Sequence, residues 1–123
     1  MSHSFDDSHP IFVQIAEKVE DDIIEGFLRE GDKISSTNEF AAYYQINPAT
    51  AAKGINKLVD DGIIFKKRGV GMFVNEGAKE ILFKKRNQAF FDAYVQPALL
   101  EARKINLSKE KLIEMIKQEG ESK

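Results

Sequence analysis

The sequence predicts a mostly α-helical protein with one small β-hairpin, made of an N-terminal domain and a short helical C-terminal segment. Three observations support this prediction. Apolar residues recur at intervals of three and four over residues 10–28, which is the spacing of one face of a helix. Over residues 63–74 the pattern changes to short apolar runs separated by glycines, which is typical of strand, turn and strand. Beyond Gly77 the helical spacing returns.

The first predicted helix occupies residues 10–28. Pro10 stands at its start, where the missing N–H costs nothing because first-turn N–H groups have no partner within the helix. Gly26 and Gly31 mark its end and the following turn. The apolar stripe consists of Ile11, Phe12, Ile15, Ala16, Val19, Ile23, Ile24 and Phe27.

A second, short helix is predicted to begin after Ser36 and to end near Tyr44 or Gln45. Ser36 and Glu39 have the spacing of a capping box, in which the two side chains accept hydrogen bonds from each other's backbone N–H groups. A third helix is predicted to follow after only a few residues. Asn47 is a good N-cap for it, with Pro48 as its first residue, and Gly62 stands where a left-handed C-terminal cap belongs.

The hairpin and the C-terminal segment complete the predicted fold. The run Ile63-Ile64-Phe65-Lys66-Lys67 is predicted to form one strand and Met72-Phe73-Val74 the other, with a glycine-containing turn between them. Residues 78–96 are predicted to be helical, and Pro97 is expected to kink or end that helix. Ser108 is predicted to cap a last short helix with its apolar side chains facing inward, namely Leu112, Ile113 and Ile116.

The order helix, short helix, tight turn, helix and basic hairpin is that of a winged helix-turn-helix, here placed over residues 9–77. The second of two closely joined helices can enter the DNA major groove, which is about 12 Å wide. A hairpin that follows directly can lie on the DNA backbone or reach into the minor groove. Acidic residues gather on the first helix, whereas the third helix and the hairpin carry Lys53, Lys57, Lys66, Lys67 and Arg68. This distribution presents one face to a polyanion and turns another away from it, although ordinary solvated faces are the alternative.

The run from Pro10 to Val74 resembles the winged helix-turn-helix of the GntR family. The matching elements, in the family's order and spacing, are P-I-F-x-Q-I-A, E-G-x-L-x-x-G-D-K-I, S-x-x-E-F-A, L-V-x-D-G-I-I and R-G-x-G-x-F-V. The later run A-F-F-D-A-Y-V-Q-P resembles the YtrA-like subfamily, whose C-terminal segment is a small dimerisation unit. The resemblance implies a transcriptional repressor that binds a palindromic operator as a homodimer. For the YtrA-like group it also implies control of a neighbouring transporter operon.

Three positions that commonly carry arginine in the family carry Asn38, Pro48 and Ala52 here. Arginine that donates two hydrogen bonds to guanine is the commonest specific base contact, so its absence changes how bases would be read. We expect Asn38, Asn47 and Thr50 to take part in that reading. Asn47 is expected to make a positioning contact because its oxygen is committed to capping, and a plain surface residue is the alternative for Thr50. The DNA-binding residues predicted on the two helix N-termini are Ser36, Thr37, Asn38, Asn47, Pro48, Ala49 and Thr50.

Cations farther along the third helix and on the hairpin are predicted to contact the DNA backbone and the minor groove. Lys66 and Lys67 point to opposite faces of a strand, so at most one of them should face phosphates, and Lys67 is taken as that one. Arg68 matches the family's minor-groove residue, and a narrow A·T-rich groove favours an inserted arginine. The residues predicted for this part of the interface are Lys53, Lys57, Lys67, Arg68 and Gly69.

The C-terminal tail, residues 78–120, is predicted to pair two chains. Its proposed interface consists of Phe90, Phe91, Tyr94 and Leu99. An aromatic stripe at helical spacing can also line a ligand pocket, but a core or an interface is the favoured interpretation. So short a segment cannot bury its apolar residues alone, nor can it enclose a cavity of about 300 Å³ within one chain. A small-molecule effector would therefore bind between subunits, or there is none.

Composition argues against several other functions. Cysteine is absent, both histidines lie in the polar leader, and no glycine-rich phosphate loop is present, so we expect no enzyme activity, catalytic residue, metal or cofactor. The leader lacks the apolar run of a signal peptide, and no stretch approaches the roughly 20 apolar residues that span a bilayer. A cytoplasmic protein is expected, with operator DNA and a second copy as partners and no membrane. The alternative function is a winged-helix module that binds protein without specific DNA binding.

Overall fold

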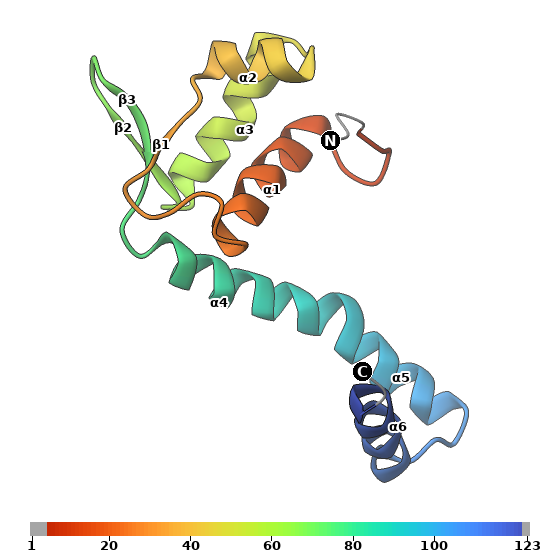
Figure 1. The fold of residues 1–123 in the computed structure, drawn as a ribbon. Helices are drawn as coiled ribbons and strands as arrows, with labels where there is room; N and C mark the ends of the chain where they lie inside the picture. Colours follow the sequence, from red (N-terminus) through yellow and green to blue (C-terminus); the bar gives the residue numbers. More distant parts are fainter. Residues whose placement is uncertain (1–4, 122–123) are drawn as a thin grey trace. The chain divides into compact units, whose positions relative to one another are not determined.

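The computed structural model describes residues 5–121, which fall into two compact units that meet after Lys84. The elements of the N-terminal unit are α1 (Ile11–Ile24), β1 (Lys33–Ile34), α2 (Thr37–Tyr44), α3 (Pro48–Asp60), β2 (Ile64–Lys67) and β3 (Gly71–Val74) (Figure 1). Then come α4 (Ala78–Phe90), which crosses from one unit to the other, a π-helical segment (Phe91–Val95), α5 (Gln96–Lys104) and α6 (Lys109–Glu121). The mostly helical fold with a small hairpin is confirmed.

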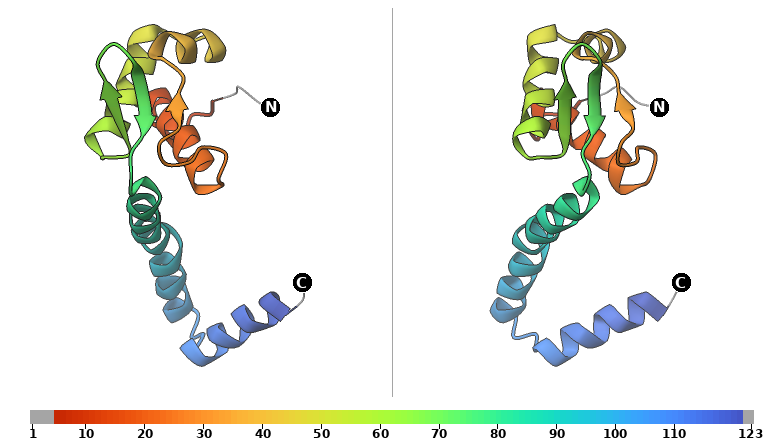
Figure 2. Two further views of the ribbon diagram at one scale, coloured as in Figure 1. Left: turned by 60° about the vertical axis from the view of Figure 1, so that its left-hand side comes forward. Right: turned by 90° about the vertical axis from the view of Figure 1, so that its left-hand side faces the viewer.

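The three strands form one antiparallel sheet in the order β1-β3-β2 (Figure 2). In the hairpin, Lys66 pairs with Met72 and Lys67 with Gly71. Strand β1 is the third strand of the sheet and pairs Lys33 with Phe73 of β3. The sequence pattern did not predict β1, because a strand of two residues is too short to show any alternation.

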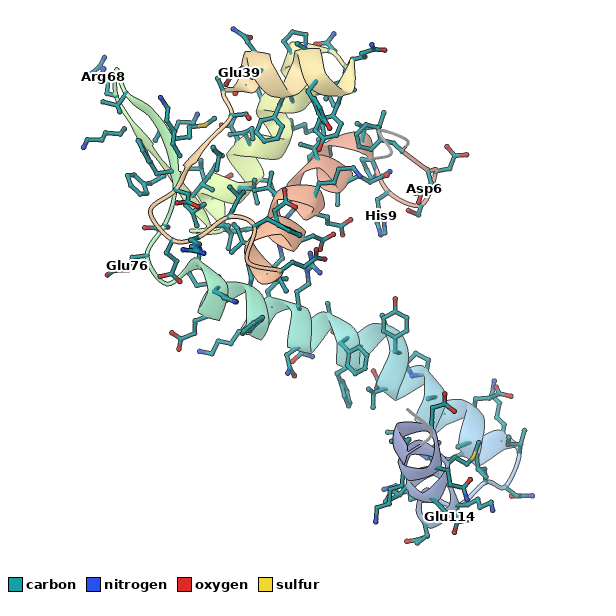
Figure 3. The ribbon with its side chains drawn as sticks, in the orientation of Figure 1. Asp6, His9, Glu39, Arg68, Glu76 and Glu114 are labelled. Carbon is teal, nitrogen blue, oxygen red and sulfur yellow. The ribbon has the colours of Figure 1, made fainter. Side chains whose placement is uncertain are left out.

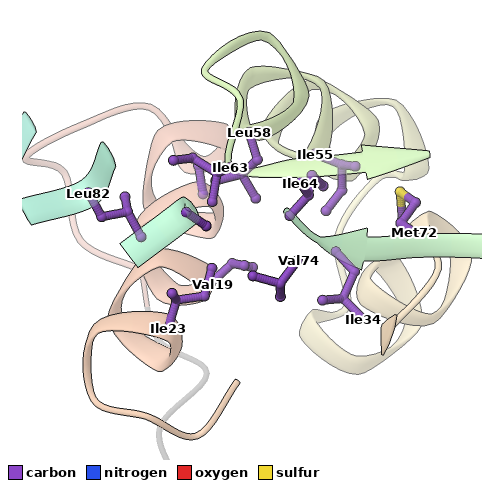
Figure 4. Close-up of a cluster of buried hydrophobic side chains, with 12 residues drawn as sticks. Val19, Ile23, Ile34, Ile55, Leu58, Ile63, Ile64, Met72, Val74 and Leu82 are labelled. Atoms are coloured by element: carbon purple, nitrogen blue, oxygen red, sulfur yellow. The ribbon is translucent and has the colours of Figure 1, made fainter. Parts of the chain in front are cut away.

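A hydrophobic core lies between the helices and the sheet (Figure 4). Its buried side chains come from α1, α3, β2, β3 and α4 and from the residue before β2, and include Val19, Ile23, Ile55, Leu58, Ile63, Ile64, Val74 and Leu82. Because Ala78 and Leu82 of α4 are buried in this core, the N-terminal unit extends beyond Gly77. Gly54 allows α1 and α3 to approach closely, since a Cβ at this position would lie 2.8 Å from the carbonyl oxygen of Phe12.

The predicted starts and ends of the short helices are confirmed. Ser36 and Glu39 form the capping box, Asn47 caps α3 with Pro48 in its first turn, and Gly62 has a φ of +78° just after it. The first helix ends earlier than its apolar stripe predicts. It stops at Ile24 because the chain turns through Gly26 at a φ of +88°, which leaves Phe27 outside the helix and 74% exposed.

In the C-terminal unit Pro97 does not end the helix. Helical backbone continues through it, because a π-helical segment comes immediately before and Pro97 occupies the first turn of α5. The N–H of Gln96 bonds to the carbonyl of Phe91, five residues back, so the wider turn accommodates a residue that cannot donate. Ser108 caps α6 as predicted, with its Oγ accepting from the N–H of Lys111 at 3.1 Å.

The prediction that the apolar side chains of α6 face inward is only partly met within one chain, where Leu112 is half-buried. Ile113 is 50% exposed and Ile116 is 64% exposed, because a single helix hairpin offers them too little surface to pack against. None of the helices in the described part of the chain is long and apolar enough to cross a membrane.

Candidate nucleic-acid interface

Helices α2 and α3 form a helix-turn-helix, with a connection that spans Gln45 to Asn47. Gln45 has a φ of +56°, a left-handed conformation that reverses the chain direction within very few residues. The N–H of Ile46 bonds back to the carbonyl of Ala41 and fixes the turn at 3.0 Å. The turn therefore sets the position of the α3 N-terminus relative to α2.

The N-terminus of α2 carries the first predicted contacts. Its capping box is closed by two hydrogen bonds, from the N–H of Glu39 to Ser36 Oγ at 3.1 Å and from the N–H of Ser36 to Glu39 Oε1 at 2.8 Å. The bond from the Ser36 backbone lowers the pKa of the Glu39 carboxyl. Thr37 is half-buried and Asn38 is exposed, so Asn38 is the more accessible of the two in the first helical turn.

The N-terminus of α3 presents the predicted base-reading residues. Asn47 Oδ1 accepts a hydrogen bond from the N–H of Ala49 at 2.7 Å, as the capping role requires. Pro48 and Ala49 are exposed, whereas Thr50 is half-buried. Of the residues predicted here, Ala49 is therefore more accessible than Thr50.

The two lysines predicted to lie on one face of α3 both have partners within the chain. Lys53 Nζ lies 4.4 Å from the ring centroid of Phe12 on α1, in a cation–π contact, but the residue as a whole stays exposed. Lys57 Nζ lies 3.4 Å from Asp61 Oδ2, and about a third of each side chain is exposed. Lys57 is thus partly neutralised by its own helix, which weakens the expectation of a phosphate contact there.

The hairpin β2–β3, together with its turn, is called the wing here. Figure 3 shows Arg68 at the far end of the wing, and Glu39 at the start of α2. Gly69 follows Arg68 with a φ of +76°, a conformation that favours glycine. Arg68 and Gly69 are exposed, as a residue that enters the minor groove requires.

Lys66 and Lys67 point to opposite faces of β2, as the strand pattern predicts. Lys66 lies on the face that packs toward α3, where its Nζ donates to Asn56 Oδ1 at 3.0 Å. Lys67 pairs with Gly71 across the hairpin and lies on the other face. Lys67 is thus on the face predicted to meet DNA, whereas the bond between Lys66 and Asn56 is not predictable from the strand pattern.

Lys33 is a further cation near the wing and is not among the residues predicted to bind DNA. Its aliphatic stem crosses Gly71, where a Cβ would lie 2.7 Å from Lys33 Cε. With Ser36, Thr37 and Val70 it lines a shallow groove of about 320 Å³ between the sheet edge, the α2 N-terminus and the wing. No sequence signal marks this contact, because it depends on the pairing of β1 with β3.

The residues predicted for the dimer interface lie in the C-terminal unit. Phe90, Tyr94 and Leu99 line an open groove of about 530 Å³ with residues of α6 such as Ile113 and Ile116. Phe90 and Tyr94 contact each other, with ring centroids 5.6 Å apart. Phe91 is 43% exposed but does not line this groove. The structure therefore brings together three of the four predicted interface residues.

Comparison with known proteins gives consistent results. The model of the bacterial regulatory proteins of the gntR family matches residues 12–74. The chain is 31% identical over 111 residues to the HTH-type transcriptional repressor YtrA of Bacillus subtilis, an alignment that covers 90% of this chain and 85% of that protein.

Two solved structures extend the comparison. A GntR family transcriptional regulator from Listeria monocytogenes superposes with a TM-score of 0.77 at 30% identity, covering 93% of this chain and 98% of the other. The DNA-binding domain of AraR in complex with operator ORX1 superposes with a TM-score of 0.53 at 26% identity, covering 60% of this chain and 89% of the other.

Proposed function

The chain belongs to the GntR family of bacterial regulatory proteins, in its YtrA-like subfamily, and from this we propose that it is a repressor that binds a palindromic operator as a homodimer. It is a DNA-binding transcriptional regulator with a winged helix-turn-helix. The family match over residues 12–74 is the observation that carries this conclusion. Residues 9–77 are proposed as the DNA-binding domain and residues 78–120 as the dimerisation segment.

The proposed DNA-binding surface consists of the α2 and α3 N-termini and the wing. Support comes from the exposure of Asn38, Ala49 and Arg68 and from the cations on α3 and the wing. The methyl groups of Ala49 and Thr50 at the start of α3 are suited to contacting thymine methyls, and the amide of Asn38 on α2 is suited to reading adenine edges. Arg68 would enter the minor groove, where narrow A·T-rich DNA concentrates negative potential.

The proposed dimer uses the exposed apolar side chains of the tail. Phe90 is 58% exposed, Tyr94 67% and Ile116 64% within one chain, and contiguous exposure of this kind is typical of an interface. Two-fold pairing of two DNA-binding domains would require half-sites about one helical turn apart, or a multiple of it.

The operator DNA indicates where in the cell the protein acts and which genes it regulates. Because operator DNA is chromosomal, the protein is proposed to act in the cytoplasm. From the resemblance of the tail to the YtrA-like subfamily, the protein is also proposed to control a neighbouring transporter operon. Deleting the gene should then raise transcription of that operon, and unchanged transcript levels would contradict this part of the proposal.

Binding-site selection with the full chain tests the main proposal. Random duplex DNA is selected at about 100 mM salt, and the enriched sequences should contain an inverted repeat. Sedimentation should show a dimer in the absence of that DNA and a complex of two chains per site in its presence. Enrichment of no sequence would favour the alternative, a winged-helix module that binds protein rather than specific DNA.

A further inference from the structure

We propose that Asn56 and Lys66 together form a phosphate-binding subsite for the DNA strand that separates the major groove from the adjacent minor groove. The proposal rests on the DNA-binding function given above and specifies how α3 and the wing share one operator half-site. The ligand is a single backbone phosphodiester, which would be held by hydrogen-bond donors from two different elements.

The two side chains meet between α3 and β2. Lys66 Nζ donates to Asn56 Oδ1 at 3.0 Å, and both residues are exposed. The register of the hairpin explains this placement, because Lys66 pairs with Met72, whose side chain is buried against the core. Lys66 thus lies on the same side of β2 as the buried Ile64, and this is the side that faces α3.

The geometry of DNA places a phosphate chain at this position. If α3 occupies the major groove, about 12 Å wide, and the wing tip occupies the adjacent minor groove, about 6 Å wide, one sugar–phosphate strand must pass between them. The space that this strand crosses is the one between α3 and β2. A side-chain pair that bridges these two elements is therefore close to the backbone, not to base edges.

The donor set suits a phosphate. The Lys66 ammonium has three N–H donors, of which Asn56 uses one, and no other partner of Lys66 occurs among residues 5–121. The Asn56 amide nitrogen supplies two more donors beside it. Charge-assisted hydrogen bonds to phosphate are the stronger kind, and the Asn56 oxygen holds the flexible lysine in place before DNA arrives.

Neighbouring cations are less well placed for this strand. Lys57 is paired with Asp61, and Lys67 lies on the opposite face of β2. One turn before Asn56 on α3 stands Ala52, whose methyl group can make no hydrogen bond. Asn56 and Lys66 are therefore the hydrogen-bonded polar pair that joins this part of α3 to β2.

The test measures operator affinity and its salt dependence for Lys66→Gln, with Lys79→Gln on α4 as the matched control. Releasing counterions from one phosphate contact is worth about fivefold in affinity at 0.15 M salt, so losing one contact per subunit should weaken a dimer about thirtyfold. The slope of log affinity against log salt should fall by about two. Specific and non-specific DNA should be affected alike, and Lys66→Arg should restore most of the binding. Lys79→Gln should change neither quantity.

The role of Asn56 is tested by a double-mutant cycle. Asn56→Ala should weaken binding more in the wild-type background than in the Lys66→Gln background, because in the latter it loses only its own donors to the phosphate and no longer the positioning of a lysine. Asn56→Asp should bind more weakly than Asn56→Ala, since it adds a negative charge beside the phosphate. Thermal unfolding of each variant should match the wild type, because both side chains are exposed.

Ethylation of single phosphates locates the contact on the DNA. Modification of a phosphate between the two grooves should impair binding of the wild type and should matter less for Lys66→Gln. If Lys66→Gln keeps the wild-type affinity and salt slope, the subsite is refuted while the DNA-binding function stands. If the wild type selects no DNA, the function itself fails.

Discussion

Replacing Gly54 with alanine is expected to destabilise the N-terminal unit, although alanine is the better helix former. In an open helix the substitution should add about 1 kcal/mol to the free energy of unfolding. Here the new Cβ would lie 2.8 Å from the carbonyl oxygen of Phe12, and 3.2 Å and 3.3 Å from two carbons of Ile15. The nearest of these atoms belongs to the α1 backbone, so α1 and α3 must move apart to relieve the contact.

The size of the effect follows from two opposing contributions. Overpacking of a well-packed core costs about 1–3 kcal/mol, from which the gain in helix propensity is subtracted. The nearest atom is backbone and cannot rotate away, so the upper part of that range, about 2–3 kcal/mol, applies. Subtracting about 1 kcal/mol leaves an expected net loss of about 1–2 kcal/mol, and each kcal/mol lost lowers the melting temperature by about 4–8 °C in a unit of this size. Gly120→Ala on α6 is the control, because nothing lies within 4 Å of a Cβ added there. Urea unfolding at one fixed protein concentration measures both variants, and a Gly54→Ala protein as stable as the wild type would refute the close approach of α1 and α3.

Three further predictions concern the interface, the operator and pH. Tyr94→Glu places a charge on the apolar face proposed to pair two chains, so sedimentation should show a monomer. The unfolding profile of the N-terminal unit should be unchanged, and a persistent dimer would contradict that interface. Arg68→Ala should weaken binding most at operators with A·T-rich flanks. Thr50→Ala should instead relax selection at one symmetric pair of positions, by about 1–3 kcal/mol per base pair. Identical selection profiles for both variants and the wild type would show that the recognition surface lies elsewhere. The hydrogen bond from the Ser36 N–H lowers the pKa of Glu39 in the folded state. The ionised Glu39 carboxylate therefore contributes stability above the unfolded-state pKa of about 4.3, and this contribution is lost as the pH falls through the folded-state pKa. Acid titration of unfolding should therefore separate the wild type from Glu39→Gln, which keeps the cap but cannot titrate, and parallel curves would contradict this role of the capping box.

The parts of the fold that could be predicted from the sequence are those that depend on neighbouring residues. The capping box at Ser36, the cap at Asn47 and the glycine after α3 are local features, and the structure has all three. The opposite orientation of Lys66 and Lys67 also follows from local strand geometry.

The features that were missed depend on residues far apart in the sequence. Strand β1 exists because Lys33 meets Phe73, and the bond between Lys66 and Asn56 requires the wing to fold back toward α3. The π-helical segment before Pro97 is another example, since local rules for proline predict a kink or an end. The partners of Lys53 and Lys57, a ring on α1 and a carboxylate one turn later, likewise changed the expected interface.

The central claim is that a dimer binds specific DNA. A mobility-shift titration tests it most directly, with the palindrome found by binding-site selection and present in the DNA upstream of the protein's own gene. Affinity for this palindrome and for a scrambled duplex is measured between 50 and 200 mM salt. If the dimer makes roughly 6–10 phosphate contacts, affinity for the palindrome should fall by about 10³–10⁵ over this range and should exceed affinity for the scrambled duplex at every salt concentration. A flat salt response, or equal affinity for the two duplexes, would contradict the claim.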